Sequence, residues 1–142
     1  MITVVIDTNV LLPAFAAGSP HSAIIRALQA GRLRWAVSQP ILCEYEEMTV
    51  ARSGAQRWRQ VLRVIQLLDL VHQSIIWTNP AYQFQVIPSD PDDNKFTDCA
   101  ITAHADYVIT SDRDFAPLAN AGYKPQPISP EEFIRQHLTG TA

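Results

Sequence analysis

The feature that most constrains the fold is a short β-branched run near the start of the chain, Thr3 to Ile6, which ends at Asp7. The run lacks the apolar–polar alternation of a half-exposed strand, so it predicts a strand buried on both faces. A second run of this kind, Tyr107 to Thr110, comes just before Asp112. Strands buried on both faces are typical of parallel sheets that helices cover on either side. The opening run therefore favours an α/β protein.

Helical segments separate the expected strands along the chain. Further strands are predicted at residues 33–37 and 74–77 and at a segment ending at Ile128, and helices at residues 21–30, 38–52, 56–71, 95–105 and 130–138. Ser38 is expected to cap the second helix, and Gly31 and Gly54 to end the first and second. This alternation predicts right-handed crossovers and a three-layer α/β/α sandwich with a central parallel sheet.

Length and charge narrow the possible classes of protein. The 142 residues suit one domain, residues 1–142, and the net charge of −3 provides no general attraction to nucleic acid. Cys43 and Cys99 are isolated, so we expect reduced core residues rather than a zinc site. The absence of a basic leader and of an apolar run of about 18 residues predicts a cytoplasmic protein outside the membrane.

Glu44 is the acidic residue whose position can be tested against helical geometry. At about 100° per residue it falls on the same stripe as Ile41, Tyr45 and Met48. An ionised carboxylate on a buried stripe is costly unless it binds a cation or pairs with a base. We therefore favour a functional carboxylate at Glu44 over a structural ion pair with an arginine.

Other acidic residues have less specific positions. Asp7 and Asp112 directly follow predicted strands, where parallel sheets bind ligands, although a carboxylate after a strand also caps turns. Asp98 lies in an apolar helical segment, where an interaction with the helix dipole explains it as well as a ligand role does. Asp114 is expected to cap the turn after it. Asn94, one turn before Asp98, is placed to orient that carboxylate or a metal-bound water.

A loop from Asn79 to Asn94 is long enough to indicate a functional segment. Its acidic cluster of Asp90, Asp92 and Asp93 is expected to be solvated or capping, with metal contact by Asp93 as the alternative. Together, the acids of the chain would converge without matching basic partners, an arrangement that a hard cation stabilises. Oxygen ligands without His or Cys at ligand spacing favour Mg²⁺ or Mn²⁺ over zinc.

Three stretches of the sequence resemble the PIN-domain family, and especially its branch of toxin–antitoxin toxins. They are VVIDTNV at residues 4–10, Glu44, and DPDDNK at residues 90–95 followed by TSDRDF at residues 110–115. The resemblance implies a metal-dependent endoribonuclease that hydrolyses RNA phosphodiester bonds to a 5′-phosphate and a 3′-hydroxyl. It also implies a cognate antitoxin protein and a homodimer.

Residue by residue, the resemblance assigns the catalytic and metal-binding carboxylates to Asp7, Glu44, Asp98 and Asp112. Family members with a similar motif often carry Glu at the position of Asp98, which is shorter by one methylene. The residues expected beside these ligands are Thr8, Asn9, Asp93, Asn94 and Thr110.

RNA must approach an acidic site, so cations are needed nearby. The candidates are Arg59, Arg63, Lys95 and Arg113, together with Arg52 if helicity continues across Gly54. Arginines on a solvated helix face are the alternative interpretation. Two other functions stay open: a non-catalytic RNA-binding or adaptor domain of the same fold, and a phosphohydrolase with Asp7 as nucleophile. The latter chemistry prefers Asp-x-Asp, whereas Asn9 stands in the second place.

Overall fold

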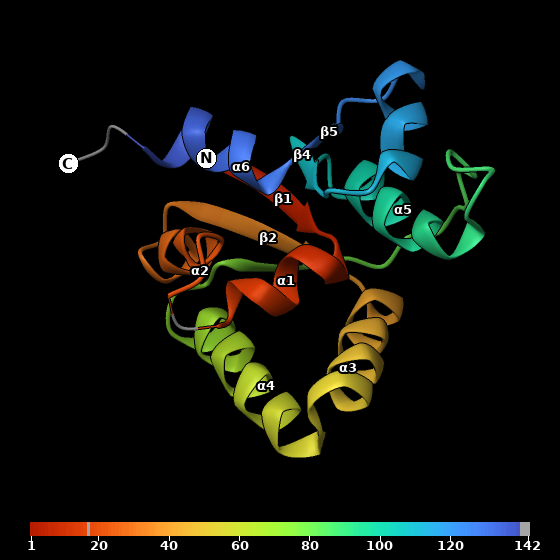
Figure 1. The fold of residues 1–142 in the computed structure, drawn as a ribbon. Coiled ribbons are helices and arrows are strands. Elements are labelled where there is room, and N and C mark those ends of the chain that lie inside the picture. Colours follow the sequence, from red (N-terminus) through yellow and green to blue (C-terminus); the bar gives the residue numbers. More distant parts are fainter. Residues whose placement is uncertain (17, 140–142) are drawn as a thin grey trace.

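A computed structural model of the protein describes residues 1–16 and 18–139. In these residues five parallel strands form one sheet in the order β3-β2-β1-β4-β5. The strands are β1 (Ile2–Ile6), β2 (Leu33–Val37), β3 (Ile75–Trp77), β4 (Tyr107–Ile109) and β5 (Gln126–Ile128). Helices cover both faces of this sheet, so the predicted three-layer α/β/α fold is confirmed (Figure 1).

The helices follow the predicted segments closely, with three additions. The helices are α1 (Thr8–Ala14), α2 (Ser22–Gln29), α3 (Gln39–Ser53), α4 (Ala55–Leu70), α5 (Asn94–Thr102), α6 (Pro130–Phe133), the 3₁₀ helices η1 (Pro91–Asp93) and η2 (Arg113–Asn120), and the π-helical turn η3 (Ile134–Leu138). The additions are α1, η2 and the short turn η1 inside the predicted loop. The sequence did not predict α1 or η2, because each contains an internal proline, Pro13 or Pro117, which normally argues against a helix.

Two glycines end helices where the sequence predicts it. Gly31 follows α2 with φ of 71°, and Gly54 separates α3 from α4 with φ of 89°. These positive φ values suit glycine, which lacks the Cβ that disfavours them. In Figure 1 α3 and α4 form the two arms of a V that meet at this bend. The cysteine prediction is wrong for Cys43, which is exposed on α3, whereas Cys99 is buried.

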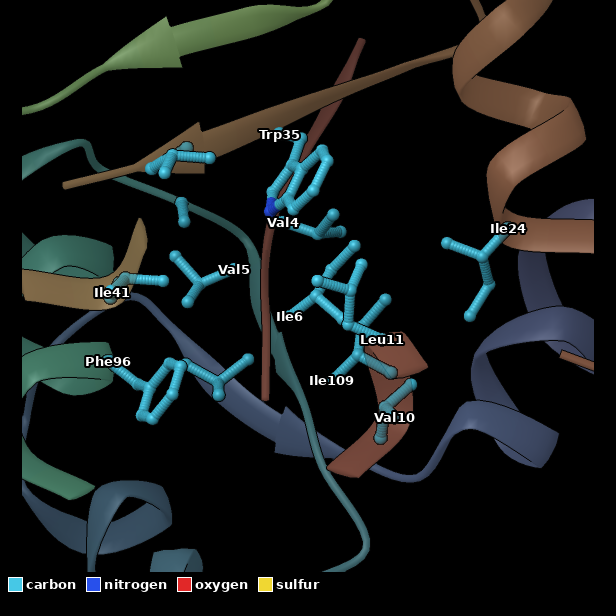
Figure 2. Packing of buried hydrophobic residues seen from close by; sticks show 14 of the residues in the cluster. Val4, Val5, Ile6, Val10, Leu11, Ile24, Trp35, Ile41, Phe96 and Ile109 are labelled. Carbon is cyan, nitrogen blue, oxygen red and sulfur yellow. The ribbon is translucent and has the colours of Figure 1, made fainter. Parts of the chain in front are cut away.

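The core lies on both sides of β1. Val4, Val5 and Ile6 have no exposed surface. Figure 2 shows Val5 pointing toward Ile41 and Phe96, while Ile6 lies on the opposite side. Burial on both faces explains why the strand carries no polar alternation.

The register of β1 and β4 determines what lies at the carboxyl edge of the sheet. Ile6 pairs with Ile109, so the residues that follow, Asp7 and Thr110, lie side by side. The backbone N–H of Asp7 donates to the carbonyl of Ile109 at 3.0 Å, which continues the pairing past the last strand residue. Among the residues described, no helix is long and apolar enough to cross a membrane.

Candidate metal centre at the carboxyl edge of the sheet

Asp7 is buried at the carboxyl end of β1, with 3% of its surface exposed. It occupies the N-cap position of α1, yet its side chain makes no capping hydrogen bond. Its Oδ2 instead accepts a hydrogen bond from Thr110 Oγ1 at 2.8 Å. The capping interpretation is therefore wrong for the Asp7 side chain, which is turned across the sheet edge toward β4.

The pKa of Asp7 is raised above its ordinary value. Burial is the largest cause, and the carboxylates of Glu44 and Asp112 act in the same direction, while the hydrogen bond from Thr110 opposes them. Glu44 and Asp112 thus act electrostatically on Asp7, because carboxylates raise each other's pKa.

Glu44 projects from α3 toward this edge and contacts two polar side chains. Its Oε2 accepts a hydrogen bond from Thr8 Oγ1, and its Oε1 lies 2.8 Å from Lys95 Nζ. The side chains of Lys95 and Glu44 are 25% and 20% exposed, so the ion pair is partly solvated. An ion pair was the alternative for Glu44, but its cation is a lysine beside the other acids rather than an arginine.

The loop after β4 orients Asp112. Its backbone N–H donates to Thr110 Oγ1 at 3.0 Å, so this threonine links it to Asp7. The Oδ1 of Asp112 accepts a hydrogen bond from the backbone N–H of Asp114 at 2.9 Å and caps η2. The sequence assigned the cap to Asp114, so the structure corrects this assignment. Asp112 keeps a second carboxylate oxygen for another interaction.

Asp93 completes the acidic group, although the sequence favoured a lesser role for it. Burial raises its pKa from 3.8 to about 7, with further contributions from the carboxylates of Asp90, Asp7, Asp112 and Glu44. Its Oδ2 is buried and accepts no hydrogen bond from the residues described. We define the acidic cluster as Asp7, Glu44, Asp93 and Asp112.

Asp98 does not join this cluster in the structure. Its Oδ1 accepts a hydrogen bond from the backbone N–H of Phe84 at 3.0 Å. Burial raises its pKa against that hydrogen bond, and none of the cluster carboxylates contributes to the shift. The predicted ligand role of Asp98 thus has no support from its surroundings, which are those of a residue that holds a loop.

The topology explains why Asp93, and not Asp98, lies among the cluster carboxylates. A helix that follows a parallel strand begins near the carboxyl edge of the sheet and runs away from it. Asp93 stands immediately before α5, whereas Asp98 lies five residues further, or about 7.5 Å along the axis at 1.5 Å per residue. The place of an acid relative to the helix start was therefore the signal that favoured Asp93.

A second acidic group extends the site toward the surface. Carboxylate oxygens of Asp90, Asp93 and Asp114 lie within 4.8 Å of one another, and all three residues are partly exposed. Asp93 thus belongs to both groups.

The acidic cluster has the donor chemistry of a hard divalent cation site, and Asp93 links it to Asp90 and Asp114, whose carboxylate oxygens lie within 4.8 Å of its own. Its donors are carboxylate oxygens, which suit Mg²⁺ or Mn²⁺. The buried Oδ2 of Asp93 has no donor among the described residues, and the neighbouring acids disfavour its ionised form. A divalent cation would remove both costs, because it supplies positive charge and a ligand position for that oxygen.

The predicted small polar residues divide between the cluster and the adjoining loop. Thr8 and Thr110 donate to cluster carboxylates. Asn94 instead holds the loop, since its Oδ1 accepts from the backbone N–H of Ile87 at 2.9 Å. Asn9 is exposed and accepts a hydrogen bond from Arg52 at 3.1 Å.

The candidate cations also divide into two sets. Lys95 contacts the cluster, and Arg52 reaches the first turn of α1 through Asn9. Arg59 and Arg63 lie exposed on α4, beyond the bend at Gly54, and neither makes an ion pair or hydrogen bond within the described residues. Arg113 is exposed next to Asp112. Lys95, Arg52 and Arg113 are therefore the cations tied to the site by contact or by sequence neighbours.

Comparison with known proteins agrees with this geometry. The family model described as PIN domain matches residues 3–114, which is most of the chain, so the protein belongs to the PIN-domain family. No curated protein matches it significantly. Similar solved structures include VapBC2 from Rickettsia felis bound to a DNA fragment from its promoter, with 14% identity and a TM-score of 0.59. That match covers 89% of this chain and 98% of the other, and it shows a shared fold.

Proposed function

We propose that this PIN domain is a Mg²⁺- or Mn²⁺-dependent endoribonuclease whose metal ligands are Asp7, Glu44, Asp93 and Asp112. The observation that carries the proposal is Asp93, whose buried Oδ2 has no hydrogen-bond partner among the described residues and whose pKa lies at about 7 among other carboxylates. Strongly perturbed carboxylates that converge at the ligand-binding edge of a parallel sheet are typical of functional sites.

The side chains around the cluster have distinct roles in this proposal. Thr110 fixes the Asp7 carboxylate and the Asp112 backbone together through its single hydroxyl. Thr8 donates to one oxygen of Glu44, while Lys95 balances part of its charge. These contacts restrict the rotamers of the ligands before substrate arrives, which reduces the reorganisation needed on binding.

A divalent cation supplies two things for phosphodiester hydrolysis: it lowers the pKa of a coordinated water and stabilises charge on the phosphate. The chain itself must attract RNA to a site that carries several negative charges. Lys95, Arg52 and Arg113 are the cations we assign to phosphate contacts, because they border the cluster.

Cleavage of a mixed single-stranded RNA pool with Mn²⁺ or with EDTA tests this function. We expect cleavage with Mn²⁺, and a loss of at least about a thousandfold in Asp7→Asn and Glu44→Gln, since metal catalysis contributes several kcal/mol. Glu47→Gln is the matched control, because Glu47 is exposed on the same helix as Glu44. It should retain the wild-type rate.

Cleavage that persists in EDTA or in Asp7→Asn would overturn the proposal. RNA binding without any cleavage by the wild-type protein would support the adaptor alternative instead. The Asp-nucleophile phosphohydrolase is not favoured, since the chain belongs to another family and carries Asn9 where that chemistry prefers an aspartate.

We further propose that the protein is the toxin of a toxin–antitoxin pair. The motif resemblance and the shared fold with VapBC2 support this role. The C-terminal part of α4, the residue after it and the end of β3 also present exposed apolar side chains, Leu67, Leu70, Val71 and Trp77, which suit a protein partner or a homodimer. Expression of the wild-type chain should arrest bacterial growth, whereas Asp7→Asn should not. Growth arrest by both would contradict a toxic nuclease activity.

A further inference from the structure

A pocket of about 700 Å³ lies beside the acidic cluster, between the start of α3, helix α5 and the loop of residues 79–92. Its walls include Ser38, Asn79, Tyr82, Gln83, Gln85 and Lys95. The volume falls within the range of about 300–1,000 Å³ that is usual for pockets that bind small ligands.

Two side chains from α5 pin the loop that forms the outer wall. Asp98 accepts from the backbone N–H of Phe84 at 3.0 Å. Asn94 makes a pair of hydrogen bonds with the backbone of Ile87, at 2.9 and 3.0 Å. Gln85 lies between these two anchors with φ of 54°, a conformation that few residues other than glycine adopt. The hydrogen bonds of Asp98 and Asn94 thus tie this wall to α5 without any ligand.

The groups that face this pocket are those that recognise a nucleobase. Tyr82 is 74% exposed, and its ring stands against Phe84, with 6.3 Å between centroids. The side-chain amides of Asn79, Gln83 and Gln85 make no hydrogen bond to any residue that the structure describes. Unpaired RNA bases are recognised by stacking on aromatic rings and by hydrogen bonds to their edges.

Lys95 connects this pocket to the acidic cluster. It lines the pocket, and its Nζ lies 2.8 Å from Glu44 Oε1. A nucleotide whose phosphate lies at the cluster therefore has its neighbour's base within reach of the pocket. The remaining charged residues of the lining are Asp92 and Asp98, so the pocket offers no second anion site for a phosphate.

We propose that this pocket binds one unpaired nucleobase of the RNA, next to the scissile phosphate, and so determines which sequences are cleaved. The assignment rests on the proposed nuclease function for the identity of the polymer. Stacking on Tyr82 and hydrogen bonds from Gln83 and its neighbouring amides discriminate among the bases.

A binding experiment without metal tests the pocket separately from catalysis. Titration of the ¹⁵N-labelled protein with each of the four nucleoside monophosphates should shift the backbone amides of residues 82–87 and Lys95. We expect Tyr82→Ala to weaken this binding roughly 5- to 150-fold, the range for loss of one base–aromatic stack. Tyr82→Phe, which keeps the ring, should restore most of the affinity.

Sequencing of cleavage products tests the role in specificity. Gln83→Ala should change the preferred base beside the cut and raise KM, whereas Gln66→Ala, which alters an exposed glutamine on α4, should change neither. Mn²⁺ affinity measured on Gln83→Ala should equal that of the wild type, which shows that the fold and cluster are intact.

The outcomes separate the two proposals. If nucleoside monophosphates shift the amide signals of residues 82–87 in a protein that cleaves no RNA, the base-binding pocket is supported and the nuclease function is overturned. If Tyr82→Ala and Gln83→Ala both cleave RNA with the wild-type base preference beside the cut and the wild-type KM, the proposal of a base-binding pocket is overturned. Shifts from a basic peptide but from no mononucleotide would also overturn it, because they would assign the pocket to a protein partner.

Discussion

Two aspartates of the α5 region, Asp93 just before the helix and Asp98 within it, have opposite surroundings. Just before the helix, Asp93 has a buried oxygen without a partner in the part of the chain that the structure describes, and other carboxylates raise its pKa. Further along, Asp98 accepts a backbone hydrogen bond from Phe84 and meets none of those acids. Burial raises the pKa of both, so burial alone does not distinguish a ligand from a structural residue. The difference lies in whether a donor within the chain already satisfies the carboxylate.

The largest effect that sharpens this comparison is on metal affinity. Asp93→Ala should weaken Mn²⁺ binding at least about a hundredfold, since even residues that only support a metal ligand contribute up to that factor. Asp98→Ala should leave the affinity within about threefold of the wild type, well below that factor. Isothermal titration calorimetry with Mn²⁺ measures both. An equal loss of Mn²⁺ affinity in the two variants would mean that Asp98 is a metal ligand as well, and the two aspartates would not differ in function.

Asp98→Ala should instead act on stability. It leaves the Phe84 N–H without its acceptor, which costs about 1–3 kcal/mol when the group stays buried. Thermal melts should show a lower Tm, and hydrogen exchange should show faster exchange at Phe84. Wild-type exchange in the loop of this variant would mean that the hydrogen bond does not hold the wall.

Asp93 also predicts how stability depends on pH. Its pKa is about 7 in the folded protein, against 3.8 for an ordinary aspartate, so the folded state binds the extra proton between these values. The metal-free protein should therefore lose stability as pH rises from about 4 to about 7 and level off above. Asp7, whose pKa is also raised, acts in the same direction.

Saturating Mn²⁺ should reverse this trend, because the metal binds the ionised carboxylates. Melting curves at pH 5 and pH 8, with Mn²⁺ or with EDTA, check the sign. Asp93→Asn is the control and should flatten the dependence in EDTA. A metal-free protein that is more stable at pH 8 than at pH 5, and unchanged by Asp93→Asn, would contradict the account.

The smallest expected effect concerns Lys95, which contacts the cluster and lines the pocket. Lys95→Gln should strengthen Mn²⁺ binding by up to about fivefold, since it removes a cation whose partly exposed pair with Glu44 contributes about 0–1 kcal/mol. It should also make the slope of the logarithm of the RNA association constant against the logarithm of salt concentration shallower by about 0.7, the value for one phosphate contact on a single strand. Fluorescence anisotropy at several salt concentrations measures this slope, and Lys124→Gln, on the exposed residue after η2, is the control. An unchanged slope would remove Lys95 from the phosphate contacts.

Local patterns in the sequence predicted most of the fold because they reflect short-range preferences. The β-branched run before Asp7 becomes a buried parallel strand, and Gly54 ends a helix where expected. Helix α1 was missed because Pro13 lies within its seven residues. Three of the proposed ligands, Asp7, Glu44 and Asp112, were identified since each follows a strand or stands on a helical stripe.

The remaining ligand could not be chosen by pattern alone. Asp93 and Asp98 both stand in or beside one apolar helix, and helical periodicity alone does not tell which of them lies near the strand ends. The position of Asp93 at the helix start decides this only once the crossover topology is known. The pocket wall was expected as a functional loop, but its hydrogen bonds to Asn94 and Asp98 join segments whose pairing no periodicity encodes.

By itself, the sequence determined the parallel sheet, the order of its helices and the presence of acids at strand ends and on a helical stripe, because strand burial, helical spacing and charge are local properties of the chain. The tertiary structure decided which carboxylates share a site. Strand register places Asp7 beside Thr110, and the start of α5 places Asp93 among the acids and Asp98 against Phe84. Electrostatic coupling depends on distance in space, and the crossover connections set that distance.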